Sequence, residues 1–370
     1  MTRKVAILAA GLFTRATAKT AIGVLRYAPY SVVAVIDPDR AGTDAAAHVG
    51  VGAGVPVVAS VAEAVARGAD TILIGTAAAG GRIADAYRPF LADALRRGLE
   101  VWNGLHERVL DDPALREAAA AGGARVRELR EPPKDLPIGG HRQPREGATV
   151  VLTVGTDAAA GKMTVALEIV AALQRAGVRA AFVATGQTGI AIAGEGIAVD
   201  AVVADFIAGA AERMVCEAAE TADWVIVEGQ GALTHPGFSG VTLGLLHGSA
   251  PDLMVLCHDA SRQVVKGYDA EGLRVRPLGE CVAIYEDAAS WGRKPQEPRA
   301  PVVAVALNTA GVGLGASRAD VATEAARACI QDAAALTGLV TADPIREGAA
   351  GGDRLARALI EARIAIRVPR

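Results

Sequence analysis

The chain has 370 residues, of which 51% are hydrophobic and 21% charged, and its formal net charge is −3. No block of Lys and Arg stands out, which argues against nucleic acid or an anionic membrane as a partner. No run approaches the ~20 apolar residues that a membrane-spanning helix needs. We therefore expect a protein that acts on a small molecule and is long enough for two domains. We also expect it to be cytoplasmic and to form a homo-oligomer.

In the first part of the chain, short apolar runs alternate with amphipathic stretches. The apolar runs predict strands at residues 5–10, 32–36, 71–74 and 100–102. The amphipathic stretches predict helices at residues 62–67 and 83–97. This alternation is typical of a parallel sheet with crossover helices, so we expect a Rossmann-like α/β domain.

The start of this domain has part of the pattern of a dinucleotide-binding unit. Asp37 follows the second predicted strand, where an acidic residue can contact a ribose. The loop after Gly11 lacks the GxGxxG glycines that let a backbone approach a pyrophosphate, so bound NAD is not expected. Lys19 and Thr20 remain candidates for anion contacts. A domain that shapes an interface, or covers the site of the second domain, is the plainer interpretation.

A segment without apolar periodicity separates this pattern from a second one. Residues 131–147 contain four prolines and three glycines, so we place the domain boundary there and expect domains at 1–140 and 141–370. The second pattern predicts strands at 149–154, 180–184, 224–228, 253–257 and 302–307, with helices at 162–176, 206–220 and 319–336. It is again an alternating α/β pattern, which predicts a P-loop NTPase-like domain with a mainly parallel sheet.

The strongest motif lies between the first strand and helix of the second domain. It comprises Gly155, Thr156, Asp157, Ala158, Ala159, Ala160, Gly161, Lys162, Met163 and Thr164. A glycine-rich loop that opens a helix presents backbone N–H groups to a phosphate, and the lysine adds a mobile positive charge. The motif therefore predicts a phosphate-binding loop.

This loop departs from the usual GxxxxGK[ST] pattern in two ways. Five residues, instead of four, separate Gly155 from Gly161, and Met163 stands where a Mg²⁺-binding hydroxyl belongs. Thr164 is the remaining hydroxyl. The four cysteines are scattered without a CxxC pair, which argues against a disulfide framework or a zinc site. We expect no resident metal ion.

Further candidates follow the strand at 224–228. Glu228 stands where P-loop proteins place an acidic residue beside the phosphates, as a metal ligand or a general base. Residues 233–249 are rich in Gly, Ser, Thr and His, and we expect a ligand-contacting loop there in which His235 acts as a base or orients the substrate. We expect His247 and His258 to be ordinary polar side chains.

A second glycine-rich stretch, residues 185–196, predicts a loop that forms one wall of the site. The candidate substrate contacts are Gln187, Thr188, Gln230, Ser239 and Arg262. An arginine offers a carboxylate two parallel hydrogen bonds. Asp205, Glu212 and Lys266 are further candidates for polar substrate groups, with exposed helix charges as an equal alternative.

Five segments are distinctive when taken together: TAKTAIGVLRY, VVAVID, GTDAAAGKMT, ATGQTGI and VEGQGALTHPGFSGVTLGLLHGS. They resemble a bacterial family long described only as a domain of unknown function, whose characterised members are D-glutamate N-acetyltransferases. The resemblance covers nearly the whole chain, and the P-loop is also similar to that of dethiobiotin synthetase. It implies transfer of an acetyl group from acetyl-CoA to the amino group of D-glutamate, in D-amino acid catabolism.

Several candidate residues fit the chemistry of acetyl transfer. A P-loop can cradle the phosphates of acetyl-CoA without hydrolysing a nucleotide, so the missing hydroxyl at Met163 is consistent with it. Glu228 or His235 would be the base, and loop N–H groups would stabilise the oxyanion. The alternative is an ATP- and Mg²⁺-dependent ligase or kinase, in which Thr164 and Glu228 hold the metal. A nucleotide-binding switch ranks last.

Overall fold

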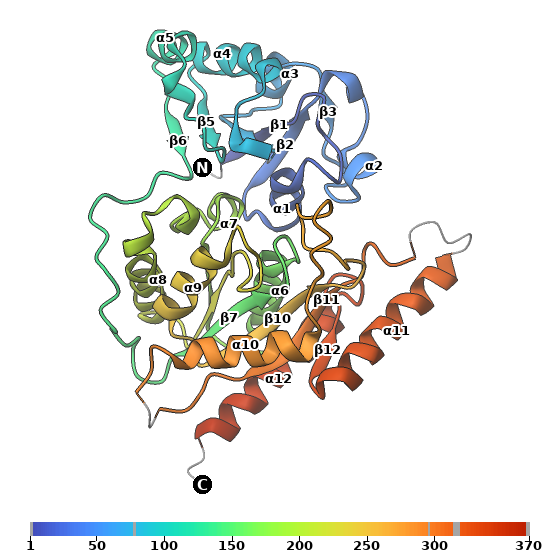
Figure 1. Ribbon diagram of the computed structural model, residues 1–370. Coiled ribbons are helices and arrows are strands. Elements are labelled where there is room, and N and C mark those ends of the chain that lie inside the picture. The colour runs from blue at the N-terminus through green and yellow to red at the C-terminus, as the bar shows by residue number, and fades with distance from the viewer. Residues whose placement is uncertain (1–2, 77–78, 295–296, 314–318, 368–370) are drawn as a thin grey trace. The chain divides into compact units, whose positions relative to one another are not determined.

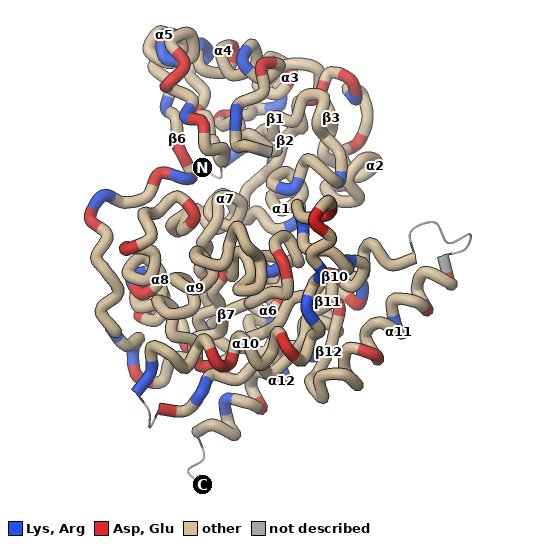
Figure 2. Tube along the Cα trace, viewed as in Figure 1, with Lys and Arg blue, Asp and Glu red and all other residues tan. Residues whose placement is uncertain are grey.

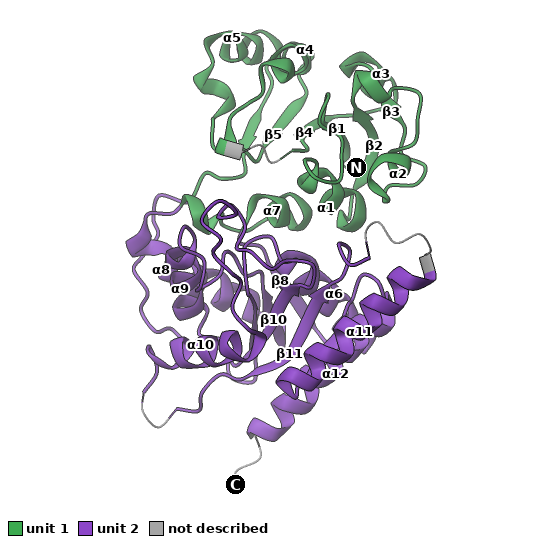
Figure 3. Ribbon diagram, turned by 45° about the vertical axis from the view of Figure 1, so that its right-hand side comes forward, with its two compact units in different colours: residues 1–132, 186–201 green, residues 133–185, 202–370 purple. Residues whose placement is uncertain are grey.

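The computed structural model describes residues 3–76, 79–294, 297–313 and 319–367. The chain divides into two compact units, each with its own six-stranded, all-parallel sheet (Figure 3). Unit 1 comprises Met1–Pro132 and Gly186–Ala201, and unit 2 comprises Pro133–Thr185 and Val202–Arg370. Residues 186–201, which were expected within the second domain, are thus counted with unit 1.

Unit 1 has the strand order β3-β2-β1-β4-β5-β6, that of a Rossmann-like sheet. Its strands are β1 (Lys4–Leu8), β2 (Ser31–Ile36), β3 (Val57–Val58), β4 (Thr71–Ile74), β5 (Glu100–Asn103) and β6 (Val126–Glu128). Its α-helices are α1 (Lys19–Tyr27), α2 (Ala45–Val49), α3 (Val61–Ala66), α4 (Arg88–Arg96), α5 (Pro113–Gly122) and α7 (Gln187–Ala193). Its short 3-10 helices are η1 (Pro38–Arg40), η2 (Ala79–Gly81), η3 (Asp85–Tyr87), η4 (Val109–Asp111) and η5 (Val199–Ala201).

Unit 2 has the strand order β12-β11-β10-β7-β9-β8, with β7 near the middle (Figure 1). Its strands are β7 (Thr149–Gly155), β8 (Ala180–Val183), β9 (Trp224–Val227), β10 (Leu253–Asp259), β11 (Val302–Asn308) and β12 (Val340–Ala342). Its helices are α6 (Lys162–Arg175), α8 (Ala204–Ala219), α9 (Ser239–Ser249), α10 (Leu278–Ser290), α11 (Ala319–Thr337) and α12 (Ala349–Arg367). The predicted fold class, a Rossmann-like domain followed by a P-loop domain, is confirmed.

The central strands β4, β7 and β9 are buried along their whole length, which explains why they are continuously apolar rather than alternating. In unit 2, α6 and α12 pack together over one face of the sheet, and a core of Val, Ile, Leu and Ala side chains lies beneath them. Helices α8 and α9 pack against each other and contact β8, β9 and β7. In the part of the chain that the structure describes, no helix has both the length and the apolar character to cross a membrane.

Two stretches that glycine content marked as loops are helical in part. Residues 233–249 include α9, in which a Cβ on Gly244 would lie 2.7 Å from the side chain of Ile207 in α8. Residues 185–196 include α7, which the glycines flank: Gly186 precedes it and Gly194, with a φ of 84°, ends it. The expectation of irregular loops was wrong there, because these glycines serve close helix packing and helix ends.

The close approach of α8 and α9 makes a testable prediction at Gly248. A Cβ there would lie 2.1 Å from the carbonyl oxygen of Ala208, a backbone atom that cannot rotate away. We expect Gly248→Ala to destabilise the protein by roughly 3 kcal/mol, the upper end of the usual cost of overpacking. Thermal unfolding measures the loss.

Gly240→Ala in the same helix is the matched control, because nothing lies within 4 Å of a Cβ at that position. Alanine is the better helix former, so the control should keep or slightly raise the unfolding temperature. Equal unfolding temperatures for the two variants would contradict the packing account.

Candidate active site

The phosphate loop lies at the carboxyl end of β7, where open parallel sheets bind ligands. Its backbone takes two turns that favour small residues, at Ala159 with a φ of 55° and at Gly161 with a φ of 103°. Gly161 is the N-cap of α6, so the loop leads directly into the amino end of a 14-residue helix. The predicted order of strand, loop and helix is confirmed.

Lys162 is buried inside this loop, with 6% of its surface exposed. Its Nζ donates a hydrogen bond to the backbone oxygen of Asp157 at 2.9 Å. A Cβ on Gly155 would lie 2.8 Å from Nζ, and one on Gly229 would lie 3.1 Å from the lysine Cδ. Gly155 and Gly229 therefore line the narrow space that holds the Lys162 side chain, which is called the slot below. Burial lowers the pKa of Lys162 from its ordinary 10.5 to about 8.

The loop offers backbone donors as well as this ammonium. The N–H of Thr156 donates to Cys257 O at 3.1 Å, and that of Ala158 donates to the Asp157 carboxylate. Among the described residues, no partner is found for the N–H groups of Ala159, Ala160 and Gly161. The first N–H groups of α6 also have no partner within the helix. An anion at this loop would be bound by these donors.

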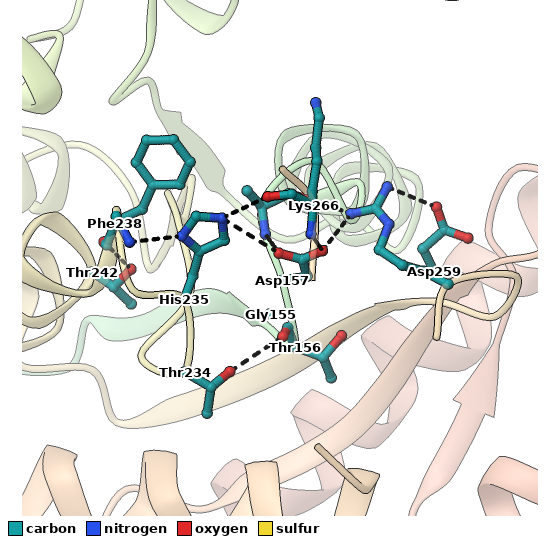
Figure 4. A network of polar contacts seen from close by, with 12 residues as sticks. Gly155, Thr156, Asp157, Thr234, His235, Phe238, Thr242, Asp259 and Lys266 are labelled. Atoms are coloured by element: carbon teal, nitrogen blue, oxygen red, sulfur yellow. Dashed lines mark hydrogen bonds and ion pairs between the residues drawn. The ribbon is translucent and has the colours of Figure 1, made fainter. Parts of the chain in front are cut away.

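The carboxylate of Asp157 is the centre of a buried polar network (Figure 4). Oδ2 accepts from Arg262 Nη1 and from the Lys266 N–H, both at 2.9 Å. Arg262 also donates to Ala158 O and pairs with Asp259 at 3.1 Å. The structure thus brings Arg262 to the phosphate loop, with its guanidinium held by two carboxylates of the protein.

His235 contacts the same network from the segment after β9. Its Nδ1 accepts from the Gly237 N–H at 3.1 Å, so Nε2 carries the proton and donates to Lys266 O at 3.1 Å. Nε2 also lies 3.9 Å from Asp157 Oδ1. The ring stacks on Phe238 with a centroid distance of 4.4 Å. Both ring nitrogens are therefore occupied by backbone groups.

Glu228 directly follows β9 and is 7% exposed. Its Oε2 accepts from the Thr185 N–H at 3.0 Å, and its backbone oxygen accepts from Thr185 Oγ1 at 2.7 Å. Gln230 donates to the backbone oxygen of Thr185 through Nε2 and accepts from Thr242 Oγ1 at 2.7 Å. The ends of β8 and β9 are thereby joined in one hydrogen-bonded cluster that contains two of the predicted site residues.

The remaining predicted site residues have separate surroundings. Ser239 begins α9, and its N–H donates to His235 O at 3.1 Å. Gln187 and Thr188 lie in unit 1, where Thr188 Oγ1 is 3.0 Å from Thr20 Oγ1. Glu212 accepts from the Gly140 N–H at 2.9 Å.

Asp37, considered for a ribose contact, is fully buried in unit 1. It accepts from the Gly11 N–H at 3.0 Å and pairs with Arg40 at 2.8 Å. Its carboxylate therefore closes the turn after β1 and caps the short helix η1.

Tyr285 is a site residue that the sequence did not reveal. It projects from α10 and is 1% exposed. Its hydroxyl donates to Gly155 O at 2.8 Å and accepts from the Leu233 N–H at 3.1 Å. It thereby ties the start of the phosphate loop to the segment that carries His235. No signal separates this tyrosine from an ordinary core residue of an amphipathic helix, because both partners are distant in sequence.

Two family models match the chain: a Rossmann-like domain of unknown function, DUF1611_N, over residues 38–132, and a P-loop domain, DUF1611_C, over residues 137–353. The chain belongs to the DUF1611 family. A D-glutamate N-acetyltransferase of Tritonibacter scottomollicae is 35% identical over 335 residues, which are 90% of this chain and 92% of that protein. A second one, from a Pseudoalteromonas species, is 35% identical over 78% of this chain and 82% of that protein.

A crystal structure of a DUF1611 family protein from Anabaena variabilis has the same fold throughout. Its TM-score is 0.85 at 36% identity, and the match covers 97% of this chain and 99% of that one. Since both named relatives are acetyltransferases and the likeness extends over most of the chain, this DUF1611 protein is an acyltransferase.

The contacts of Tyr285 predict a loss of activity in the variant Tyr285→Phe. Removing the hydroxyl leaves Gly155 O and the Leu233 N–H without their partner, which costs roughly 1–3 kcal/mol. We expect the rate of acetyl transfer to fall about tenfold, because the loop loses the hydrogen bond that holds Gly155, its first residue, in position. Steady-state kinetics and thermal unfolding measure the two effects.

Tyr87→Phe is the matched control, because it removes a buried hydroxyl that bonds Thr76 Oγ1 at 3.1 Å in unit 1. It should lower stability without lowering activity. A similar loss of activity in both variants would show that the effect of Tyr285 is on stability alone.

Proposed function

We propose that this DUF1611 protein transfers the acetyl group of acetyl-CoA to the amino group of D-glutamate, a step in D-amino acid catabolism. The buried ammonium of Lys162, held inside a phosphate loop between two glycines, is the observation that carries the proposal. Two relatives that match most of the chain are named D-glutamate N-acetyltransferases, which supports the proposal.

The loop suits the pyrophosphate of coenzyme A. Lys162 supplies a positive charge, and the N–H groups of Ala159, Ala160 and Gly161 supply hydrogen-bond donors. Helix α6 adds the positive end of its dipole. Binding a pyrophosphate in this way requires no metal-bound hydroxyl, which is consistent with Met163 in place of Ser or Thr.

The reaction needs a base, because the ammonium group of the acceptor must lose a proton before its nitrogen can attack the thioester carbon. We assign this role to Glu228, which lies at the end of the strand next to β7. A C–N bond forms and the C–S bond breaks. The second proton of the nitrogen passes to the leaving thiolate, and the proton that Glu228 has taken up is released to water. Because its ring nitrogens are both bonded to backbone groups, His235 supports this step by holding the segment after β9 in place.

A thiol-release assay tests the proposal. The protein is given acetyl-CoA and a panel of D- and L-amino acids, with and without ATP and Mg²⁺. We expect thiol release with D-glutamate that does not depend on ATP. Phosphate production from ATP without thiol release would instead favour a ligase or kinase, for which Thr164 in α6 and Glu228 would be the metal ligands.

Lys162→Ala tests the phosphate assignment within the same assay. Loss of a buried charge-assisted donor should raise the KM for acetyl-CoA at least about tenfold, with little change in the KM for the amino acid. Lys134→Ala, at an exposed lysine, is the matched control. A folded Lys162→Ala variant with the wild-type KM for acetyl-CoA would refute the assignment.

The lowered pKa of Lys162 predicts how coenzyme A affinity depends on pH. The Lys162 side chain binds phosphate only in its protonated, ammonium form, and burial lowers its pKa from 10.5 to about 8. Affinity should therefore be constant below about pH 8 and fall as pH rises above it, by up to about tenfold per pH unit. A lysine with the ordinary pKa would show no decline until about pH 10.

Calorimetric titration with an S-methyl thioether of coenzyme A avoids ionisation of the thiol and measures this dependence. Lys162→Arg keeps its charge throughout the range and should remove the decline. A decline of the same size in Lys162→Arg would assign the pH dependence to another group.

A further inference from the structure

A polar groove lies in unit 1 at the carboxyl edge of β4, β5 and β6. It consists of two cavities of about 280 and 240 Å³, both lined by Leu105, His106 and Arg130. This edge is where open parallel sheets bind ligands. Ligand pockets usually measure ~300–1,000 Å³, so a groove of this size suits a molecule as small as an amino acid.

Glycines form one side of the groove. Gly80 and Gly81 both have positive φ, at 79° and 65°. A Cβ on Gly81 would lie 2.4 Å from the ring of His106. The N–H groups of His106 and Glu107 both donate to Gly81 O at 2.9 Å. The segments after β4 and β5 are thereby fixed to each other, and only glycine fits at Gly81.

Arg130 supplies a fixed cation to both cavities. Its Nε donates to Gly104 O at 2.8 Å, and Nη1 pairs with Asp200. Among the described residues, no partner is found for Nη2. Two contacts therefore hold the guanidinium in place while N–H groups remain available to a carboxylate.

The two cavities differ in the charges that line them. In the smaller one, the polar side chains are His106, Arg130 and Gln187, with no carboxylate among the described residues. The larger one also contains Glu128, Glu131 and Arg108, and Arg108 forms a salt bridge with Glu131. Figure 2 shows acidic and basic residues close together on β6 and the chain that follows it. One end of the groove thus suits an anionic group. The other end offers a cationic group the carboxylate of Glu128, for which no salt bridge is found among the described residues.

We propose that this groove binds a small α-amino acid, with its carboxylate at Arg130 and Gln187 and its ammonium near Glu128 and Glu131. The inference rests on the groove itself. The acceptor of the proposed reaction and an amino acid that regulates the enzyme without reacting share this chemistry, and the experiment separates them.

Binding is measured on the full chain by NMR with labelled histidine. The chain has only six histidines, so the resonance of His106 is assigned from its loss in His106→Gln. D-glutamate and L-glutamate are the probes. We expect a saturable shift of the His106 resonance, and a Kd at least about tenfold weaker in Arg130→Gln. Arg97→Gln, at an exposed arginine paired with Asp93, should leave the Kd unchanged.

Two milder variants keep the inference testable if Arg130→Gln fails to fold. Arg130→Lys keeps the charge near Asp200 but loses the planar fork, and Gln187→Ala removes the second contact. Both should weaken binding while the protein stays folded. Absence of a His106 shift, or an unchanged Kd in every folded variant, would overturn the inference.

Kinetics of the same variants identify the ligand. A raised KM for the amino acid with an unchanged KM for acetyl-CoA would assign the groove to the acceptor. Weaker binding with both KM values unchanged would assign it to a regulatory amino acid. If the wild-type protein transferred no acetyl group but bound glutamate through Arg130, the proposed function would fail and the groove would stand.

Discussion

The buried carboxylate of Asp157 fixes the geometry of the phosphate loop. A carboxylate removed from water is costly unless charged and hydrogen-bonded partners surround it. Here Arg262 and two backbone N–H groups, those of Ala158 and Lys266, provide those partners. The loop cannot shift without breaking these bonds, so its donors stay in position before any ligand arrives, which reduces the entropy lost on binding.

The second constraint is the narrow slot of Lys162. Burial favours the neutral amine and lowers the lysine pKa, while the negative charges of Asp157 and Glu228 oppose that shift. A phosphate in the loop would add further negative charge and raise the lysine pKa again. Burial in the slot thus makes the ammonium less stable than it is in water. Gly155 and Gly229 leave room for the lysine side chain, because a Cβ at either position would lie close to it.

Much of the fold could be predicted from the sequence because the central strands, such as β4, β7 and β9, are fully buried. Continuous apolar runs revealed most of the longer strands, and the ten residues from Gly155 to Thr164 revealed the phosphate loop. The glycine content led to a wrong prediction where glycine permits close packing of helices. In α9, Gly244 and Gly248 permit contact with α8, and the sequence pattern does not distinguish such glycines from those of a loop.

The partners of the site residues could not be predicted, because they come from distant parts of the chain. Asp157 meets Arg262, 105 residues away, and Gly155 meets Tyr285, 130 residues away. Gln187 was predicted to contact the substrate because it follows the strand at 180–184 in a glycine-rich stretch. The chain passes into unit 1 at Gly186, directly after Thr185, which binds Glu228. The segment that begins directly after a contact of the candidate base thus contributes Gln187 to the groove of the Rossmann-like unit.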